Sequence, residues 1–137
     1  MADFAVVERG ERLARRLVAR FGPAVGADRQ PGLLVIGPGV TELPVPLVCQ
    51  TVLLPGSCSG LLNRVRAKSA VSYGLSGRDT ITLSSRRGDR LWVAVQRELV
   101  RLDGTVLERQ EFSVQVGEEL DTLSVLALTG AKLLLGQ

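Results

Sequence analysis

The stretch that most constrains the fold of this chain spans residues 47–73, LVCQTVLLPGSCSGLLNRVRAKSAVSY. Residues 47–54 are apolar at nearly every position, which is typical of a strand covered by helices on both faces. The small polar turn that follows predicts a helix capped by Ser57 or Ser59 and ending near Ala67, with another strand after it. We therefore predict a βαβ unit whose two strands are parallel and whose crossover is right-handed.

The length of the chain limits how many such units it holds. Its 137 residues are the usual size of one domain, so we expect residues 1–137 to form a single α/β domain. Hydrophobic residues make up 45% of the chain, yet no apolar run approaches the roughly 20 residues that span a bilayer. Because the N-terminus is also too charged for a signal peptide, we expect a cytoplasmic protein without a membrane span.

The composition also restricts the chemistry. The chain contains no histidine, which removes the commonest general base and the usual metal ligand. Cys49 and Cys58 match no metal or redox spacing, so we expect two free thiols, no metal site and no cofactor. A net charge of +3 and only 4% aromatic residues argue against dedicated nucleic-acid binding.

The segments before the βαβ unit predict one helix and one strand. Residues 33–36 are apolar and precede a Gly-Pro-Gly turn, which indicates a short buried strand. Residues 5–21 predict an amphipathic, basic helix. Its apolar side would hold Val6, Leu13, Leu17 and Phe21, and its opposite side Arg9, Arg12, Arg16 and Arg20.

After the βαβ unit, residues 80–116 predict a continuous antiparallel meander of three strands. Asp103-Gly104 is the sequence of a two-residue hairpin turn. Pairing outward from that turn places Val95 opposite Phe112, Val93 opposite Val114 and Leu91 opposite Val116, all on one face. The other face would pair Glu98 with Arg109, Gln96 with Glu111 and Ala94 with Ser113.

The tail from residue 118 predicts a helix that is apolar nearly all round. Acidic residues at its start and Lys132 near its end suit the helix dipole. Gly130 inside it indicates close packing. Because this helix and the basic N-terminal helix offer more apolar surface than a small sheet covers, we expect a homodimer.

The best candidate site lies beyond the carboxyl ends of the two parallel strands, where ligands of such sheets bind. Two loops meet there, and the amides of the first would point at an anion from a helix N-terminus. The candidate ligand-binding residues are Gly56, Ser57, Cys58, Ser59, Gly60, Arg64, Ser76 and Arg78.

One motif in this region resembles a known enzyme family. Cys58 is separated by five residues from Arg64, and the heptapeptide CSGLLNR resembles the phosphate loop of low-molecular-weight phosphatases, with Gly60 at a glycine position of that loop. The resemblance implies that Cys58 would attack phosphorus while Arg64 holds the phosphoryl oxygens. The chain departs from the family at Val65, where the family has a hydroxyl residue.

Residues 73–137 resemble the closing part of the central domain of peptidoglycan-precursor (Mur) ligases. The shared features are the Tyr73-Gly74-Leu75 turn, the strands after it, and a glycine before an alanine-rich helix. The chain lacks that family's phosphate loop with its lysine and its histidine, so the resemblance does not imply ligase activity.

Together these features predict a three-layer-like α/β domain: a parallel βαβ unit, an antiparallel three-stranded extension, and helices packed on the sheet. The preferred function is non-catalytic binding of a small anionic ligand or a protein partner. Two alternatives stay open, a small phosphatase-like enzyme acting on a phosphorylated metabolite and a homo-oligomeric assembly module.

Overall fold

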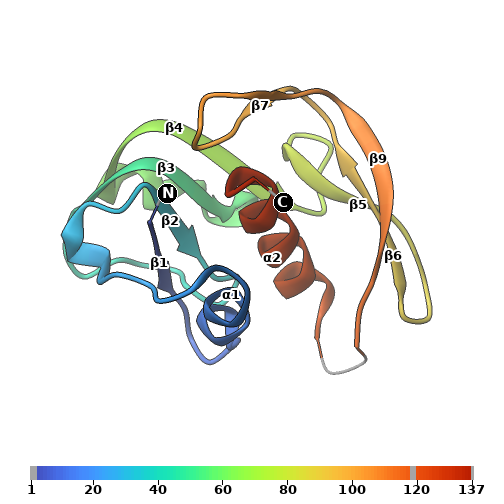
Figure 1. Cartoon of the computed structure of the whole chain (residues 1–137), viewed down its shortest axis with the longest axis horizontal. Coiled ribbons are helices and arrows are strands. Elements are labelled where there is room, and N and C mark those ends of the chain that lie inside the picture. The colour runs from blue at the N-terminus through green and yellow to red at the C-terminus, as the bar shows by residue number, and fades with distance from the viewer. Residues whose placement is uncertain (1–2, 118–119, 137) are drawn as a thin grey trace.

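The structure is a computed structural model that describes residues 3–117 and 120–136. Within these residues, seven strands form one sheet in which spatial order follows chain order (Figure 1). The first five strands are parallel to one another. They are β1 (Phe4–Val7), β2 (Leu33–Ile36), β3 (Leu47–Pro55), β4 (Val65–Gly74) and β5 (Ile81–Arg87). This parallel sheet confirms the predicted α/β fold class.

The second half of the sheet is antiparallel, as predicted. Strand β6 (Arg90–Val95) pairs with β5 on one side and with β9 (Gln110–Gln115) on the other. The meander is not continuous, because the chain leaves the sheet after β6. There it forms a separate small hairpin from β7 (Leu99–Val100) and β8 (Val106–Leu107).

The predicted pairing register of β6 and β9 was wrong by two residues. Val93 lies opposite Phe112, Leu91 opposite Val114 and Ala94 opposite Glu111. The hairpin turn holds three residues, because the Arg101 N–H donates to the Thr105 carbonyl and encloses residues 102–104. Gly104, at φ 89°, supplies the left-handed position that a three-residue loop needs.

A slip of two residues leaves every side chain on its predicted face, since strand side chains alternate with a period of two. Val93 is therefore fully buried, and Phe112 and Val114 are partly buried against the same core. Trp92, which points to the opposite face, is 39% exposed.

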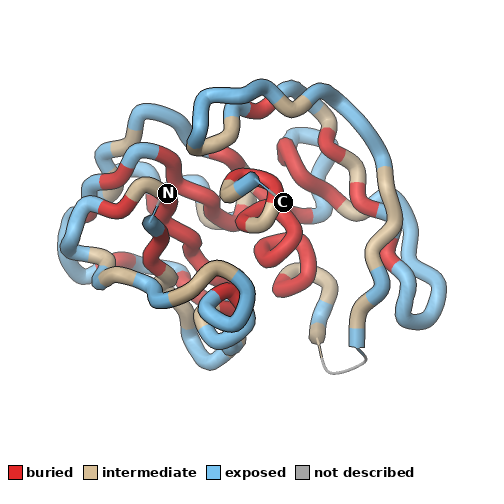
Figure 2. The backbone as a smooth tube through the Cα atoms, viewed as in Figure 1, coloured by how far each residue is buried: buried red, intermediate tan, exposed pale blue. Residues whose placement is uncertain are grey.

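Both α-helices lie on one face of the sheet. Helix α2 (Thr122–Leu134) packs against strands β2 to β5 and against α1 (Leu13–Phe21). In Figure 2, α2 appears as an almost wholly buried helix at the centre of the molecule. Asp121 caps α2 by accepting the Ser124 N–H at 2.7 Å, and the predicted C-terminal helix is confirmed from residue 122 onward. Residues 118 and 119 lie outside the described part.

Gly130 has the close contacts that its position inside α2 suggested. A Cβ atom there would lie 2.8 Å from Ile81 Cδ1 and 3.1 Å from Leu53 Cδ1. Both side chains are fully buried, so they have little room to move. The glycine therefore lets α2 approach the sheet at the level of β3 and β5.

The N-terminal segment is not one helix over residues 5–21. Val6 lies in β1, which pairs in parallel with β2, so sheet pairing prevails over the helical spacing of the apolar residues. Helix α1 starts only at Leu13, and Arg12, at φ 64°, forms the left-handed junction before it. Arg16 and Arg20 remain on the helix as predicted.

The opposite face of the sheet has no α-helix among the described residues. It buries a second cluster that includes Leu34, Val52 and Leu54, and this cluster is completed by Val40 and Leu43 from the loop after β2 and by Leu61. Leu61 belongs to η2 (Gly56–Arg64), a 3₁₀-helix that joins β3 to β4. A further 3₁₀ turn, η1 (Ala27–Arg29), precedes β2.

The α-helix predicted to run from the turn to Ala67 was therefore wrong. Strand β4 already begins at Val65, where it pairs with Leu47, so nine residues must lead back along all of β3. That strand is about 26 Å long, whereas a nine-residue α-helix covers only about 14 Å and a 3₁₀-helix about 18 Å. The 3₁₀-helix therefore comes closer than the α-helix to spanning the length of β3.

Candidate functional site

The predicted site residues gather at one edge of the sheet but divide between two hollows. Gly56, Ser57, Ser76 and Arg78 line a hollow of about 490 Å³ at the carboxyl ends of β3 and β4. Cys58, Gly60 and Arg64 line a neighbouring hollow of about 460 Å³, which Ser57 also borders. Ser59 is exposed.

The turn does not form the helix N-terminus on which anion binding was predicted. Neither Ser57 nor Ser59 caps η2, whose first residue follows Pro55. Cys58, at φ −121° and ψ 45°, departs from helical geometry and divides the segment. Because the amides of residues 56–60 do not belong to one regular helix, their dipoles do not add as in a full helix. Anion binding by these residues stays a prediction.

The arginine of the phosphatase-like heptapeptide is engaged elsewhere. Arg64 donates from Nε to the Leu43 carbonyl at 3.3 Å and from Nη2 to the Pro44 carbonyl at 3.0 Å. These two bonds fasten the loop after β2 onto η2. Glu42 lines the same hollow as Cys58, and its negative charge opposes a phosphoryl group there.

Two other groups that could have served as nucleophiles or acids are held inactive by burial. Burial raises the pKa of Cys49 to about 11, so this thiol stays protonated at neutral pH. Burial also raises the pKa of Tyr73, and the charges of Glu11 and Asp121 add to that rise. The Tyr73 hydroxyl donates to the Ile36 carbonyl at 2.6 Å, which ties β4 to β2.

The first hollow contains a carboxylate that sequence analysis did not select. Asp79 is only 3% exposed, and its Oδ2 accepts the Ser76 N–H at 3.1 Å. A Cβ atom on Gly56 would overlap Asp79 Oδ1, and one on Gly74 would overlap Oδ2. The signal in the sequence was the pair of glycines at the ends of two strands, but only the fold brings Asp79 between them.

The N-terminus of α1 is likewise filled by the chain's own carboxylates. Glu8 accepts the Leu13 N–H at 2.7 Å and the Ala14 N–H at 3.0 Å. Glu11 accepts the Gly39 N–H at 2.9 Å from the loop after β2. The donors that would attract an external anion at this helix end are therefore already occupied.

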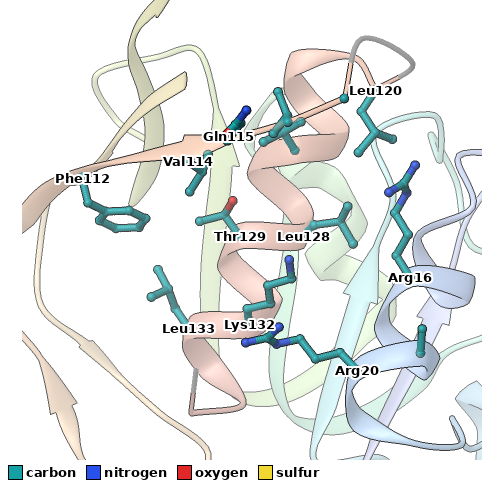
Figure 3. A pocket seen from close by; sticks show the side chains of 14 residues that line it. Arg16, Arg20, Phe112, Val114, Gln115, Leu120, Leu128, Thr129, Lys132 and Leu133 are labelled. Atoms are coloured by element: carbon teal, nitrogen blue, oxygen red, sulfur yellow. The ribbon is translucent and has the colours of Figure 1, made fainter. Parts of the chain in front are cut away.

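A groove of about 830 Å³ crosses α2 between α1 and β9 (Figure 3). We call it the α1–α2–β9 groove. Helix α2 forms its floor, with Leu128, Thr129 and Leu133 between the two walls. Phe112 and Val114 enter from β9, so most of the surface near the sheet is apolar.

Cationic side chains reach the same groove from the opposite side. Arg16 and Arg20 extend from α1, and Lys132 extends from α2 beside Arg20 (Figure 3). Burial lowers the pKa of Lys132, and the charges of Arg20 and Arg16 lower it further. The lowered pKa of Lys132 thus reflects first the burial of its ammonium group and second the positive charges beside it.

Among residues 3–117 and 120–136, no three potential metal ligands lie close enough together to hold a metal ion. Both cysteines are free thiols, as the sequence predicted. No helix in the same residues is long and apolar enough to cross a membrane. Comparison with models of known protein families and with curated protein sequences found no match.

Proposed function

We propose that this domain is a non-catalytic binding module that takes an acidic, amphipathic segment of a partner protein into the α1–α2–β9 groove. The observation that carries the proposal is the combination of an apolar floor with three cationic side chains, Arg16, Arg20 and Lys132. Binding modules of this type receive one face of a helix in a hydrophobic groove.

The apolar part of the groove supports a hydrophobic anchor. Phe112, Val114 and Leu120 are only partly buried although they adjoin the main core. Fully burying an aliphatic or aromatic side chain is worth about 1.5–3 kcal/mol relative to leaving it exposed. A few leucine or phenylalanine side chains of a partner would therefore become buried in the groove. They would also cover the apolar surface that Phe112, Val114 and Leu120 leave exposed.

The charge of the groove supports an acidic partner. Lys132 is disfavoured in its charged form by burial and by two neighbouring cations. A carboxylate of the partner, placed near Lys132, would favour the charged form and reverse part of that penalty. Two-fold self-association through this groove would place the like-charged α1 helices of the two copies near each other, which disfavours a second copy of this chain as the occupant. A cytoplasmic location, expected from the sequence, would keep Cys49 and Cys58 reduced.

The test is binding of a fluorescent designed helical peptide of about 18 residues, five turns, with leucine on one face and glutamate beside it. We expect micromolar binding that weakens as salt rises, because exposed charges are screened within about 8 Å at physiological ionic strength. A peptide with glutamine in place of each glutamate should bind at least about tenfold more weakly, a difference of about 1.4 kcal/mol.

The protein variants locate the site. Lys132→Gln combined with Arg20→Gln should weaken binding of the acidic peptide, whereas Arg15→Gln on the exposed side of the same helix should not. Equal affinity for the acidic and glutamine peptides would contradict the proposal. Light scattering that finds a dimer lost in the Lys132 and Arg20 variant would instead identify a second copy as the occupant and overturn it.

A further inference from the structure

A second binding site follows from the environment of Asp79, and it shares no lining residue with the α1–α2–β9 groove. Asp79 belongs to the loop over residues 75–80, which connects the parallel strands β4 and β5. Its carboxylate lies inside the hollow of about 490 Å³ at the carboxyl ends of β3 and β4. Ligands of open α/β sheets bind in this position.

The Asp79 side chain is almost entirely buried and, within the described residues, accepts a single hydrogen bond. One backbone donor reaches it, from Ser76 N to Oδ2 at 3.1 Å. Within residues 3–117 and 120–136, no donor bonds to Oδ1 and no lysine or arginine forms an ion pair with Asp79. Buried carboxylates are ordinarily paired with a cation or surrounded by several donors. The side chain therefore has an oxygen available for a donor that comes from outside the chain.

The surrounding backbone is built to admit this carboxylate. Gly56 directly follows β3, and Gly74 is the last residue of β4. A Cβ atom at either position would overlap one of the two oxygens of Asp79. The main chain of Asp79 is fixed as well, because its carbonyl accepts Gln96 Nε2 at 2.6 Å and its N–H donates to Ser76. The carboxylate is thus held in one place before any ligand arrives.

The walls of the hollow are mainly apolar. Pro55 and Tyr73 are buried at its base, and Leu75 and Leu123 flank it. Leu75 is 66% exposed, so it has apolar surface left for a ligand to cover. Arg78 also lines the hollow, and its positive charge weakens the binding of any cation, so that a ligand with two cationic groups is disfavoured more than a ligand with one.

We propose that this hollow binds a primary monoamine with an apolar body, whose ammonium group donates to Asp79 Oδ1 while its carbon chain lies against Leu75 and Leu123. Ammonium groups donate charge-assisted hydrogen bonds to carboxylates, and these are the stronger class of hydrogen bond. The proposal is independent of the groove, since the two sites share no residue.

The test is titration of the whole protein with n-butylammonium chloride, followed by amide resonances of residues 74–80. We expect a Kd of about 1 mM, ordinary for a ligand with so few atoms. n-Butanol and sodium butyrate keep the chain but lose the charge or reverse it, and 1,4-diaminobutane adds a second cation. Each should bind at least about tenfold more weakly.

Two variants keep the test decisive. Asp79→Asn retains the shape of the side chain and should lose at least about tenfold in amine affinity. Leu75→Ser alters an exposed side chain, so the fold is retained, and it should weaken n-butylammonium more than methylammonium. The proposal is overturned if butylammonium moves no resonance of this loop at about 20 mM, or if butanol or the Asp79→Asn variant binds equally well.

Discussion

Replacing Gly56 by alanine should destabilise the protein, although Gly→Ala changes outside left-handed positions usually stabilise. The reason is the Asp79 carboxylate, whose Oδ1 occupies the place of the missing Cβ. The new methyl group would force the carboxylate away from Gly56. Gly74 blocks movement in the other direction, because the carboxylate already fills the space beside it. The side chain must therefore give up its bond with the Ser76 N–H or shift the loop.

The size of the effect can be worked out from these two contributions. Overfilling a well-packed site costs typically about 1–3 kcal/mol. Loss of a hydrogen bond to a charged group costs about 1.5–3 kcal/mol. Against this, the lower entropy of the unfolded chain contributes about 0.4–1 kcal/mol of stability. We therefore expect a net loss of about 2–4 kcal/mol, and a fall in Tm of about 10 °C for a chain of this length.

The assay is urea unfolding followed by Trp92 fluorescence and circular dichroism. Gly60→Ala is the matched control, because Gly60 lies in the same 3₁₀-helix and a Cβ atom there meets nothing within 4 Å. It should leave stability unchanged or raise it slightly. In an Asp79→Ala background the effect of Gly56→Ala should shrink by more than about 1 kcal/mol. Equal effects of Gly56→Ala and Gly60→Ala, or full additivity with Asp79→Ala, would refute the reasoning.

Three further expectations concern other parts of the fold. Tyr73→Phe removes the buried bond to the Ile36 carbonyl and should lower the free energy of unfolding by about 1–3 kcal/mol in a denaturant titration, which a loss below about 0.5 kcal/mol would contradict. Glu8→Ala removes the carboxylate that caps α1 and should lower the free energy of unfolding by about 1 kcal/mol. The control is Glu108→Ala, which removes a carboxylate that caps no helix. Iodoacetamide at pH 8 should modify half-buried Cys58 in the native protein and leave Cys49 unmodified until unfolding, since burial raises the pKa of Cys49 to about 11; equal rates in mass spectrometry would show this wrong.

The sequence determined the elements whose signals are local. Strand β2 and helix α2 were predicted because a buried strand reads as a short apolar run and a buried helix as a long one. The face assignment of Val93 and Phe112 also followed from the sequence, because alternation with a period of two survives a slip of two residues. The close packing at Gly130 was a local signal of the same kind.

Distances in space decided the remaining elements. The length of β3 and its pairing with β4 from Leu47 onward made the crossover a 3₁₀-helix, although its sequence suited an α-helix cap. Pairing with β2 drew Val6 into a strand, although its spacing fitted a helix. Both outcomes depend on hydrogen bonds between segments far apart in the chain, and no local pattern records them.

The two candidate binding sites needed the tertiary structure for the same reason. Asp79 is an ordinary loop aspartate in the sequence, and only the meeting of Gly56 with Gly74 makes it a buried carboxylate in a hollow. Arg20 and Lys132 belong to opposite ends of the chain, and only the packing of α1 against α2 brings them to one groove. The sequence by itself thus determined which side chains were available, and the sheet decided which of them became neighbours.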